Sequence, residues 1–117
     1  MTYVDGFVAA VPSANKEAYI KHAETAAALF EKHGALNVVK CWGDDVPDGK
    51  INSFHTAVLR KEDETVVFSW VTWPDKATRD AGWQNLMADP RMQTDVNPMP
   101  FDGTRLIYGG FGMIVGP

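Results

Sequence analysis

Three polar residues fall inside segments that are otherwise apolar, and they are the strongest candidates for chemistry in this chain. They are Asp5, Lys40 and Ser69, each near the middle of a different apolar segment. Burying a carboxylate or an ammonium group is costly unless a partner compensates its charge. One interpretation is a structural hydrogen-bond or ion-pair cluster. The other is the polar floor of a pocket whose walls would be Phe7, Trp42 and Trp70.

Among the three histidines, His55 is the one that we expect near such a pocket. His22 and His33 are eleven residues apart on one predicted helix. That spacing separates them by about 16 Å along the helix axis, too far for a shared metal ion. The aspartates around residue 45 resemble a calcium loop, but Val46 and His55 occupy two of the ligand positions. The sequence therefore predicts no metal site and no bound cofactor.

A second candidate site lies at Asp102 and Arg105, which flank an irregular segment rich in proline. The other interpretation of these two residues is an ion pair that anchors a loop. Three glycines, Gly109, Gly110 and Gly112, follow inside an apolar segment. They indicate either a bulge or the close approach of another group, which would be a helix, a partner chain or a ligand.

The composition is typical of one soluble globular domain spanning residues 1–117. With 15 acidic against 11 basic residues and no basic cluster, the chain is not expected to bind nucleic acid. It has no apolar run of the roughly 20 residues that a membrane span needs, and its first residues lack the pattern of a signal peptide. The single cysteine, Cys41, is expected to be a buried, inert thiol and fits a cytoplasmic protein.

Hydrophobic periodicity predicts the elements that must position these residues. Ser13 is the expected N-cap of the first helix, and Gly34 is expected to end it. Residues 53–59 are interpreted as a short helix behind Ser53, with a short strand as the alternative. The predicted strands span residues 3–11, 36–42, 65–73 and 105–115, and the predicted longer helices span residues 13–33 and 75–88.

This β-α-β-β-α-β order predicts an α+β fold of the ferredoxin-like type, with a four-stranded antiparallel sheet and two helices on one face. Both faces of the sheet are apolar. In the third strand, Val67 and Trp73 point to one face, whereas Val66, Phe68 and Trp70 point to the other. Two helices cover only one face, so the other face needs a cover. A second copy of the chain is the simplest cover, and long loops are the alternative.

Four sequence blocks, in order along the chain, resemble the YbaA-like family of small bacterial proteins. They read YVDGFV at residues 3–8, DVPDGK at 45–50, VVFSW at 66–70, and MPFDG with the following arginine and YGGF between residues 99 and 111. The resemblance implies a fold similar to the dimeric α/β-barrel superfamily, in which two ferredoxin-like sheets pack face to face. That superfamily includes cofactor-free monooxygenases, haem-binding enzymes, lactone isomerases and non-catalytic stress proteins, so its fold does not select one chemistry.

Two hypotheses about function follow. The first is a cofactor-free enzyme that acts on a small apolar or aromatic metabolite. Its pocket would be lined by tryptophans, Met87 and Met99, with His55 or Arg105 at the mouth. The second is a non-catalytic small-molecule-binding or stress-related dimer, whose aromatic residues form only the core and the interface. An open cavity of about 300 Å³ or more with converging polar groups favours the first hypothesis, and a closed core favours the second.

Overall fold

The computed structural model describes residues 1–117, the whole chain. Its helices and strands follow the predicted order, and three short 3₁₀ turns are added to them. In chain order, the elements are β1 (Tyr3–Pro12), α1 (Lys16–Lys32), β2 (Asn37–Trp42), α2 (Phe54–Ala57), β3 (Glu64–Trp73), α3 (Lys76–Ala88) and β4 (Ile107–Gly112). The 3₁₀ turns are Ser13–Asn15, Pro90–Met92 and Gly103–Arg105.

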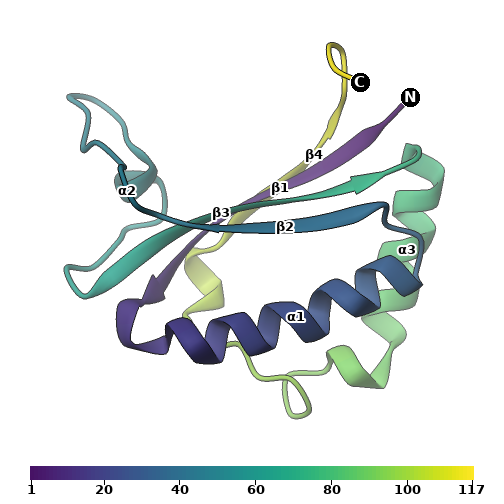
Figure 1. Ribbon diagram of the computed structural model, residues 1–117, viewed down its shortest axis with the longest axis horizontal. Coiled ribbons are helices and arrows are strands. Elements are labelled where there is room, and N and C mark those ends of the chain that lie inside the picture. The colour runs from purple at the N-terminus through teal and green to yellow at the C-terminus, as the bar shows by residue number, and fades with distance from the viewer.

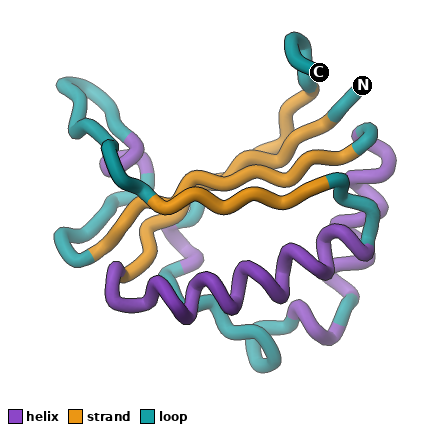
Figure 2. The backbone as a smooth tube through the Cα atoms, in the orientation of Figure 1, coloured by secondary structure: helices purple, strands orange, loops and turns teal.

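The four strands form one antiparallel sheet in the order β2-β3-β1-β4. The long helices α1 and α3 lie on one side of this sheet, whereas α2 lies on the other side near one end (Figure 1). The loops on either side of α2 project beyond that end of the sheet (Figure 2). This arrangement confirms the predicted α+β fold with a four-stranded antiparallel sheet and two long helices on one face. No helix combines the length and the apolar composition that crossing a membrane requires.

The helix ends follow from local side-chain chemistry. Asp75 caps α3 by accepting the Thr78 backbone N–H at 2.7 Å, and Ser53 forms a capping box with Thr56 that starts α2. The short helix expected at residues 53–59 is therefore confirmed. The expected N-cap at Ser13 is wrong, because its hydroxyl lies 2.7 Å from the Thr65 hydroxyl and a 3₁₀ turn precedes α1.

The register of the strands assigns each side chain to one of the two faces. Odd-numbered residues of β1 and β3 point toward α1 and α3, because Trp73 and Val71 of β3 are fully buried beneath those helices together with Leu86 of α3. The even-numbered residues of β1 and β3 point to the opposite face of the sheet, which we call the open face. There, α2 and its loops cover only the end around Val8 and Val66.

The open face is apolar, as the alternation of the sequence predicts. Phe68 is 44% exposed and Phe111 is 63% exposed, and half-buried Trp70 packs beside Phe68 at a ring distance of 5.7 Å. Cys41 is also exposed there, so the expectation of a buried thiol is wrong. The register explains the error, because Cys41 pairs with Phe68 and its neighbours Lys40 and Trp42 take the helix-covered face instead.

Strand β4 is shorter than predicted. Residues 105–115 were expected to be extended, but Arg105 belongs to a 3₁₀ turn and the strand ends at Gly112. Of the three glycines predicted in this segment, Gly110 is the one closely approached by side chains of the same chain. A methyl group at Gly110 would lie 2.5 Å from the Tyr3 hydroxyl oxygen and 2.9 Å from Nη2 of Arg79. Of the two predicted explanations, a bulge or a close approach, the close approach is therefore found at Gly110, where it is made by residues from β1 and α3.

Candidate ligand pocket between α1 and β2

Asp5, Lys40 and Ser69 all point to the helix-covered face of the sheet. Lys40 pairs with Ser69 across β2 and β3, and Ser69 pairs with Phe7 across β3 and β1. Asp5 lies two residues from Phe7 on the same strand and therefore on the same face. The three polar residues share one layer of the protein, but their environments differ.

The Asp5 carboxylate is fully used in a structural cluster. Its Oδ1 accepts from Nη2 of Arg79 at 2.8 Å, and its Oδ2 accepts from the indole N–H groups of Trp73 and Trp83, each at 2.9 Å. The hydrogen bonds between Arg79 and Asp5 raise the pKa of the Arg79 guanidinium above its usual value. With its charge paired and its oxygens occupied, Asp5 ties β1 to α3 and leaves nothing free for a ligand.

Lys40 has no comparable partner. Its Nζ donates to the Ser69 hydroxyl at a long 3.5 Å and lies 5.2 Å from the centre of the Phe7 ring. No carboxylate lies within 4.0 Å of it, because none of the ion pairs in the structure includes Lys40. Burial without a counter-charge disfavours the ammonium form and lowers the pKa of Lys40 to about 8.

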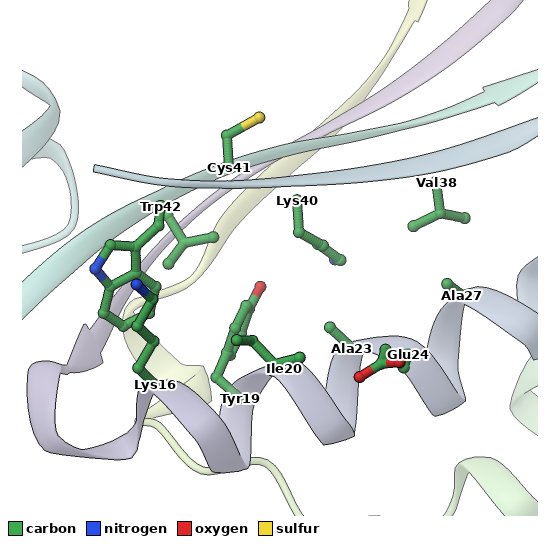
Figure 3. A pocket seen from close by; sticks show the side chains of 11 residues that line it. Lys16, Tyr19, Ile20, Ala23, Glu24, Ala27, Val38, Lys40, Cys41 and Trp42 are labelled. Atoms are coloured by element: carbon green, nitrogen blue, oxygen red, sulfur yellow. The ribbon is translucent and has the colours of Figure 1, made fainter. Parts of the chain in front are cut away.

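A pocket of about 330 Å³ lies between α1 and β2, and eight of its eleven lining residues are hydrophobic. Helix α1 contributes Ala23 and Ala27, whose small side chains leave the space open, and β2 contributes Val38, Lys40 and Trp42. Figure 3 shows Lys40 and Trp42 projecting from the strand toward the helix, with Cys41 between them pointing away from the pocket. The pocket is therefore an apolar cavity with Lys40 in its strand wall.

Tyr19 supplies a second polar group to this pocket. Its side chain rises from α1 with the hydroxyl directed toward the sheet (Figure 3), and its ring packs 6.4 Å from that of Trp42. The hydroxyl makes none of the side-chain hydrogen bonds found in the protein, and burial raises the pKa of Tyr19 to about 12. Tyr19 thus remains protonated at neutral pH and offers a hydrogen-bond donor.

The rim of the pocket carries charges of both signs. Lys16 lies over the Trp42 ring with its Nζ 5.5 Å from the ring centre, and Glu24 lies about two helical turns farther along α1. Both residues are exposed. The rim therefore has no strong electrostatic preference, and Tyr19 and Lys40 provide the inner polar groups.

His22 is a neighbour of this region, and its ring lies 6.4 Å from that of Tyr19. In the structure it is half-buried beneath the segment that joins α3 to β4, where its Nδ1 lies 3.1 Å from Oδ1 of Asn97. Burial lowers the pKa of His22, and the charge of Lys40 lowers it further, against the opposing effect of Asn97.

The remaining candidates do not line this pocket. Trp70 points to the open face, so the prediction that it forms part of the pocket wall is wrong. The register explains the difference, because Trp42 pairs with Val67 on the helix-covered face, whereas Trp70 is on the other face of β3. His55 lies in α2 on that opposite side, with its Nδ1 2.9 Å from Oδ1 of Asp48. Met87 is 71% exposed on α3, and Met99 is also exposed outside the pocket.

Asp102 and Arg105 form a loop anchor, as one of the two interpretations of the sequence held. Arg105 donates to both carboxylate oxygens of Glu64 at 2.7 and 2.6 Å, to the Leu59 carbonyl at 2.9 Å and to Asp102 at 3.0 Å. These bonds lower the pKa of Glu64 to about 2. The cluster fastens the segment before β4 to the start of β3, so neither residue faces the mouth of the pocket.

Tyr19 was not among the predicted pocket residues. The spacing of Tyr19, Ala23 and Ala26 is as typical of a helix face packed in a core as of one that lines a pocket. The available signal was the pair of alanines at i and i+4, Ala23 and Ala27, opposite a strand that carries a lysine. Small residues on a buried helix face leave space that larger side chains would fill. No group of three or more His, Cys, Asp or Glu side chains has an arrangement that would hold a metal ion.

Comparison with known proteins adds the family. Residues 2–103 match the family described as "Protein of unknown function (DUF1428)". The chain is 55% identical over 115 residues to "Uncharacterized protein YbaA" of Escherichia coli K12, an alignment that covers 98% of both chains. The same identity and coverage hold for the protein of that name from Shigella flexneri. These matches confirm the resemblance to the YbaA-like family, and the chain belongs to the DUF1428 family of proteins of unknown function.

Proposed function

We propose that this protein binds a small, mostly apolar or aromatic metabolite in the α1–β2 pocket through an oxygen atom of the ligand. The observation that carries the proposal is the pairing of an apolar cavity of about 330 Å³ with two donors, Lys40 and Tyr19, that lack strong partners in the protein. Cavities of this size with a few convergent polar groups are typical of small-molecule sites. A cofactor-free enzyme and a non-catalytic binding protein both use such a site.

The chemistry of the pocket defines the class of ligand. Val38, Trp42 and the alanines of α1 favour an aliphatic or aromatic body. The Lys40 ammonium can only donate hydrogen bonds, and the Tyr19 hydroxyl can donate one and accept others, so an acceptor atom at the polar end of the ligand suits both groups. A carbonyl, carboxylate or hydroxyl oxygen can accept from both groups, whereas a ligand with only N–H groups would leave the Lys40 ammonium without an acceptor.

The experiment that tests this proposal uses two probes with the same phenylpropyl body, 3-phenylpropanol and 3-phenylpropanoate. Binding is measured by saturation-transfer NMR and calorimetry. We expect Ala27→Phe, which fills the cavity, to weaken binding at least about tenfold. The matched control is Ala28→Phe, because Ala28 is the next residue of α1 but is exposed and outside the pocket. Equal binding by the two variants, or no saturable binding of either probe to the wild type, would overturn the proposal.

The open face supports a second proposal, that the working molecule is a cytoplasmic homodimer joined through this face. The face carries no charged side chain along its centre, where Trp70 and Phe68 of β3 lie near Phe111 of β4. In a two-fold dimer the same patch meets itself, so an uncharged apolar patch is self-compatible where a charged one would repel its copy. The α1–β2 pocket lies on the other face, so each protomer would keep its own ligand site.

A further inference from the structure

We propose that the amine of Lys40 is a nucleophile that forms a reversible imine with an aldehyde or ketone bound in the α1–β2 pocket. This inference rests on the proposed function, because it takes the same pocket and narrows the ligand class to carbonyl compounds. It adds a covalent step that binding alone does not require.

The first support is the contrast between Lys40 and the buried carboxylates. Asp5 is paired with Arg79, Glu64 with Arg105, and Asp89 with both Arg91 and His33. The fold thus supplies an opposite charge to each of its buried acids. Lys40 has only the Ser69 hydroxyl at 3.5 Å and the face of the Phe7 ring. An ammonium group brings three N–H donors, so the site suits a neutral amine better than a permanent cation.

The second support is the availability of the neutral form. Because burial lowers the pKa of Lys40 to about 8, about a quarter of the amine is uncharged near pH 7.5. An exposed lysine with its usual pKa is neutral at only about one part in a thousand at that pH. Desolvation in an apolar pocket is a known way of activating lysine for attack on carbonyl compounds.

The geometry also provides for the oxygen of the carbonyl group. Lys40 comes from β2 and Tyr19 from α1, and both project into the space between the strand and the helix (Figure 3). Tyr19 is a protonated donor with no competing hydrogen bond in the protein, so its hydroxyl can hold the carbonyl oxygen while Lys40 approaches the carbon. The apolar walls favour the neutral amine over the ammonium form.

The chemistry balances without an oxidant, reductant or metal. The lone pair of Nζ attacks the carbonyl carbon, and the C=O π electrons move to the oxygen. A proton passes from nitrogen to oxygen and gives the carbinolamine. The nitrogen lone pair then expels the oxygen, which leaves as water after taking up a second proton, and loss of the remaining N–H proton gives the neutral imine. One water is released for each imine formed, and hydrolysis reverses the sequence.

The test uses 3-phenylpropanal as the probe, with sodium borohydride to reduce any imine to a stable secondary amine. The modified chain should gain the mass of the aldehyde less one oxygen atom. Peptide mapping after brief treatment near pH 7.5 should show at least about tenfold more modification at Lys40 than at Lys50 or Lys61, which are exposed lysines of the same molecule. Lys40→Arg, which keeps a cation but removes the amine nucleophile, should lose this preferential labelling.

The outcomes separate this inference from the proposed function. If 3-phenylpropanol and 3-phenylpropanoate bind in the manner that the pocket predicts but Lys40 is trapped no more than Lys50 and Lys61, the imine is refuted and the binding site stands. If the probes do not bind and Lys40 is not labelled preferentially, both are refuted. Preferential labelling of Lys40 that Ala27→Phe abolishes and Ala28→Phe retains supports both. Circular dichroism and thermal unfolding of each variant verify that it is folded.

Discussion

Asp5 and Lys40 have the same appearance in the sequence, because each is a charged residue inside an apolar strand, yet the structure gives them opposite roles. Asp5 accepts hydrogen bonds from one guanidinium and two indoles. Lys40 donates one long hydrogen bond to Ser69. A charged group whose partners come from its own chain stabilises the fold, whereas one that lacks them is available to a ligand. The hydrogen-bond partners, more than the residue types, distinguish a structural cluster from a candidate site.

The structural role of Asp5 leads to a stability prediction. Asp5→Asn should lower the free energy of unfolding by about 3 kcal/mol, because it removes the charge that pairs with Arg79. An amide NH₂ at the position of Oδ2 would also face the indole donors of Trp73 and Trp83. Denaturant unfolding followed by tryptophan fluorescence measures this loss.

A matched control for this variant is Asp80→Asn. Asp80 also bonds to Arg79, at 3.0 Å, but its side chain is half-exposed. We expect a much smaller loss of stability, because solvent already screens that pair. Equal losses from the two variants would contradict the assignment of Asp5 as the centre of the cluster.

At the scale of elements, small residues on the two long helices determine how closely each helix packs against the sheet. Gly82 of α3 packs against the indole of Trp73, and a methyl group at this position would overlap the ring and lie 2.8 Å from the His33 carbonyl oxygen. The alanines of α1 do not produce the same contact with β2, and the pocket occupies the space between them. One helix therefore closes its part of the core, and the other leaves its part open.

The segment between α3 and β4 is held by Arg105, and this anchor predicts a pH dependence. The pKa of Glu64 is lowered from 4.5 to about 2 by the hydrogen bonds from Arg105. A carboxylate with a lowered pKa in the folded state stabilises the protein fully above its unfolded pKa, and this stabilisation disappears as the pH falls through the folded value. The contribution should therefore be complete above about pH 5 and be lost between about pH 4.5 and pH 2.

The variant that tests this dependence is Glu64→Gln. Near pH 7 it should be less stable than the wild type by about 1 to 3 kcal/mol, and the difference should shrink toward zero near pH 2. Urea unfolding at several pH values measures it. Asp102→Asn is the control, because Asp102 bonds to the same arginine from an exposed position and should have a smaller effect. A difference that is constant from pH 7 to pH 2 would contradict the role of the Glu64 charge.

At the scale of the whole molecule, the two faces of the sheet have different surroundings. The helix-covered face contains the Asp5 cluster and the α1–β2 pocket. The open face is covered by α2 and its loops at one end and exposes aromatic side chains along the rest. The proposed ligand on one side and the proposed partner chain on the other would therefore not compete for the same surface.

The homodimer proposal predicts the effect of a charge on the open face. Wild-type protein should sediment with twice the mass of one chain at micromolar concentration, and Phe111→Glu should shift it toward the monomer by placing a carboxylate in an apolar interface. Met87→Glu is the matched control, because Met87 is 71% exposed and Phe111 63% exposed, but Met87 lies on α3. A wild-type monomer, or a dimer that Phe111→Glu leaves intact, would contradict this interface.

The sequence by itself determined the order of the elements, the α+β class and the apolar character of both sheet faces. These features depend on periodicity and on local signals, such as the Asp75 and Ser53 caps and the positive φ of Gly34. Local signals act over a few residues, so they are visible in the chain. Family membership was likewise visible in four short blocks.

Only the tertiary structure decided which polar residues are paired. The partners of Asp5 lie 68, 74 and 78 positions away along the chain. Arg105 bonds to its near neighbour Asp102, but its other two partners, Glu64 and Leu59, lie 41 and 46 positions away. No local pattern specifies such pairings, because they depend on how strands and helices from distant segments are brought together. The same reason explains why Trp70 and Trp42 are on opposite faces, why Cys41 is exposed, and why the empty space lies between α1 and β2 beside Lys40 and Tyr19.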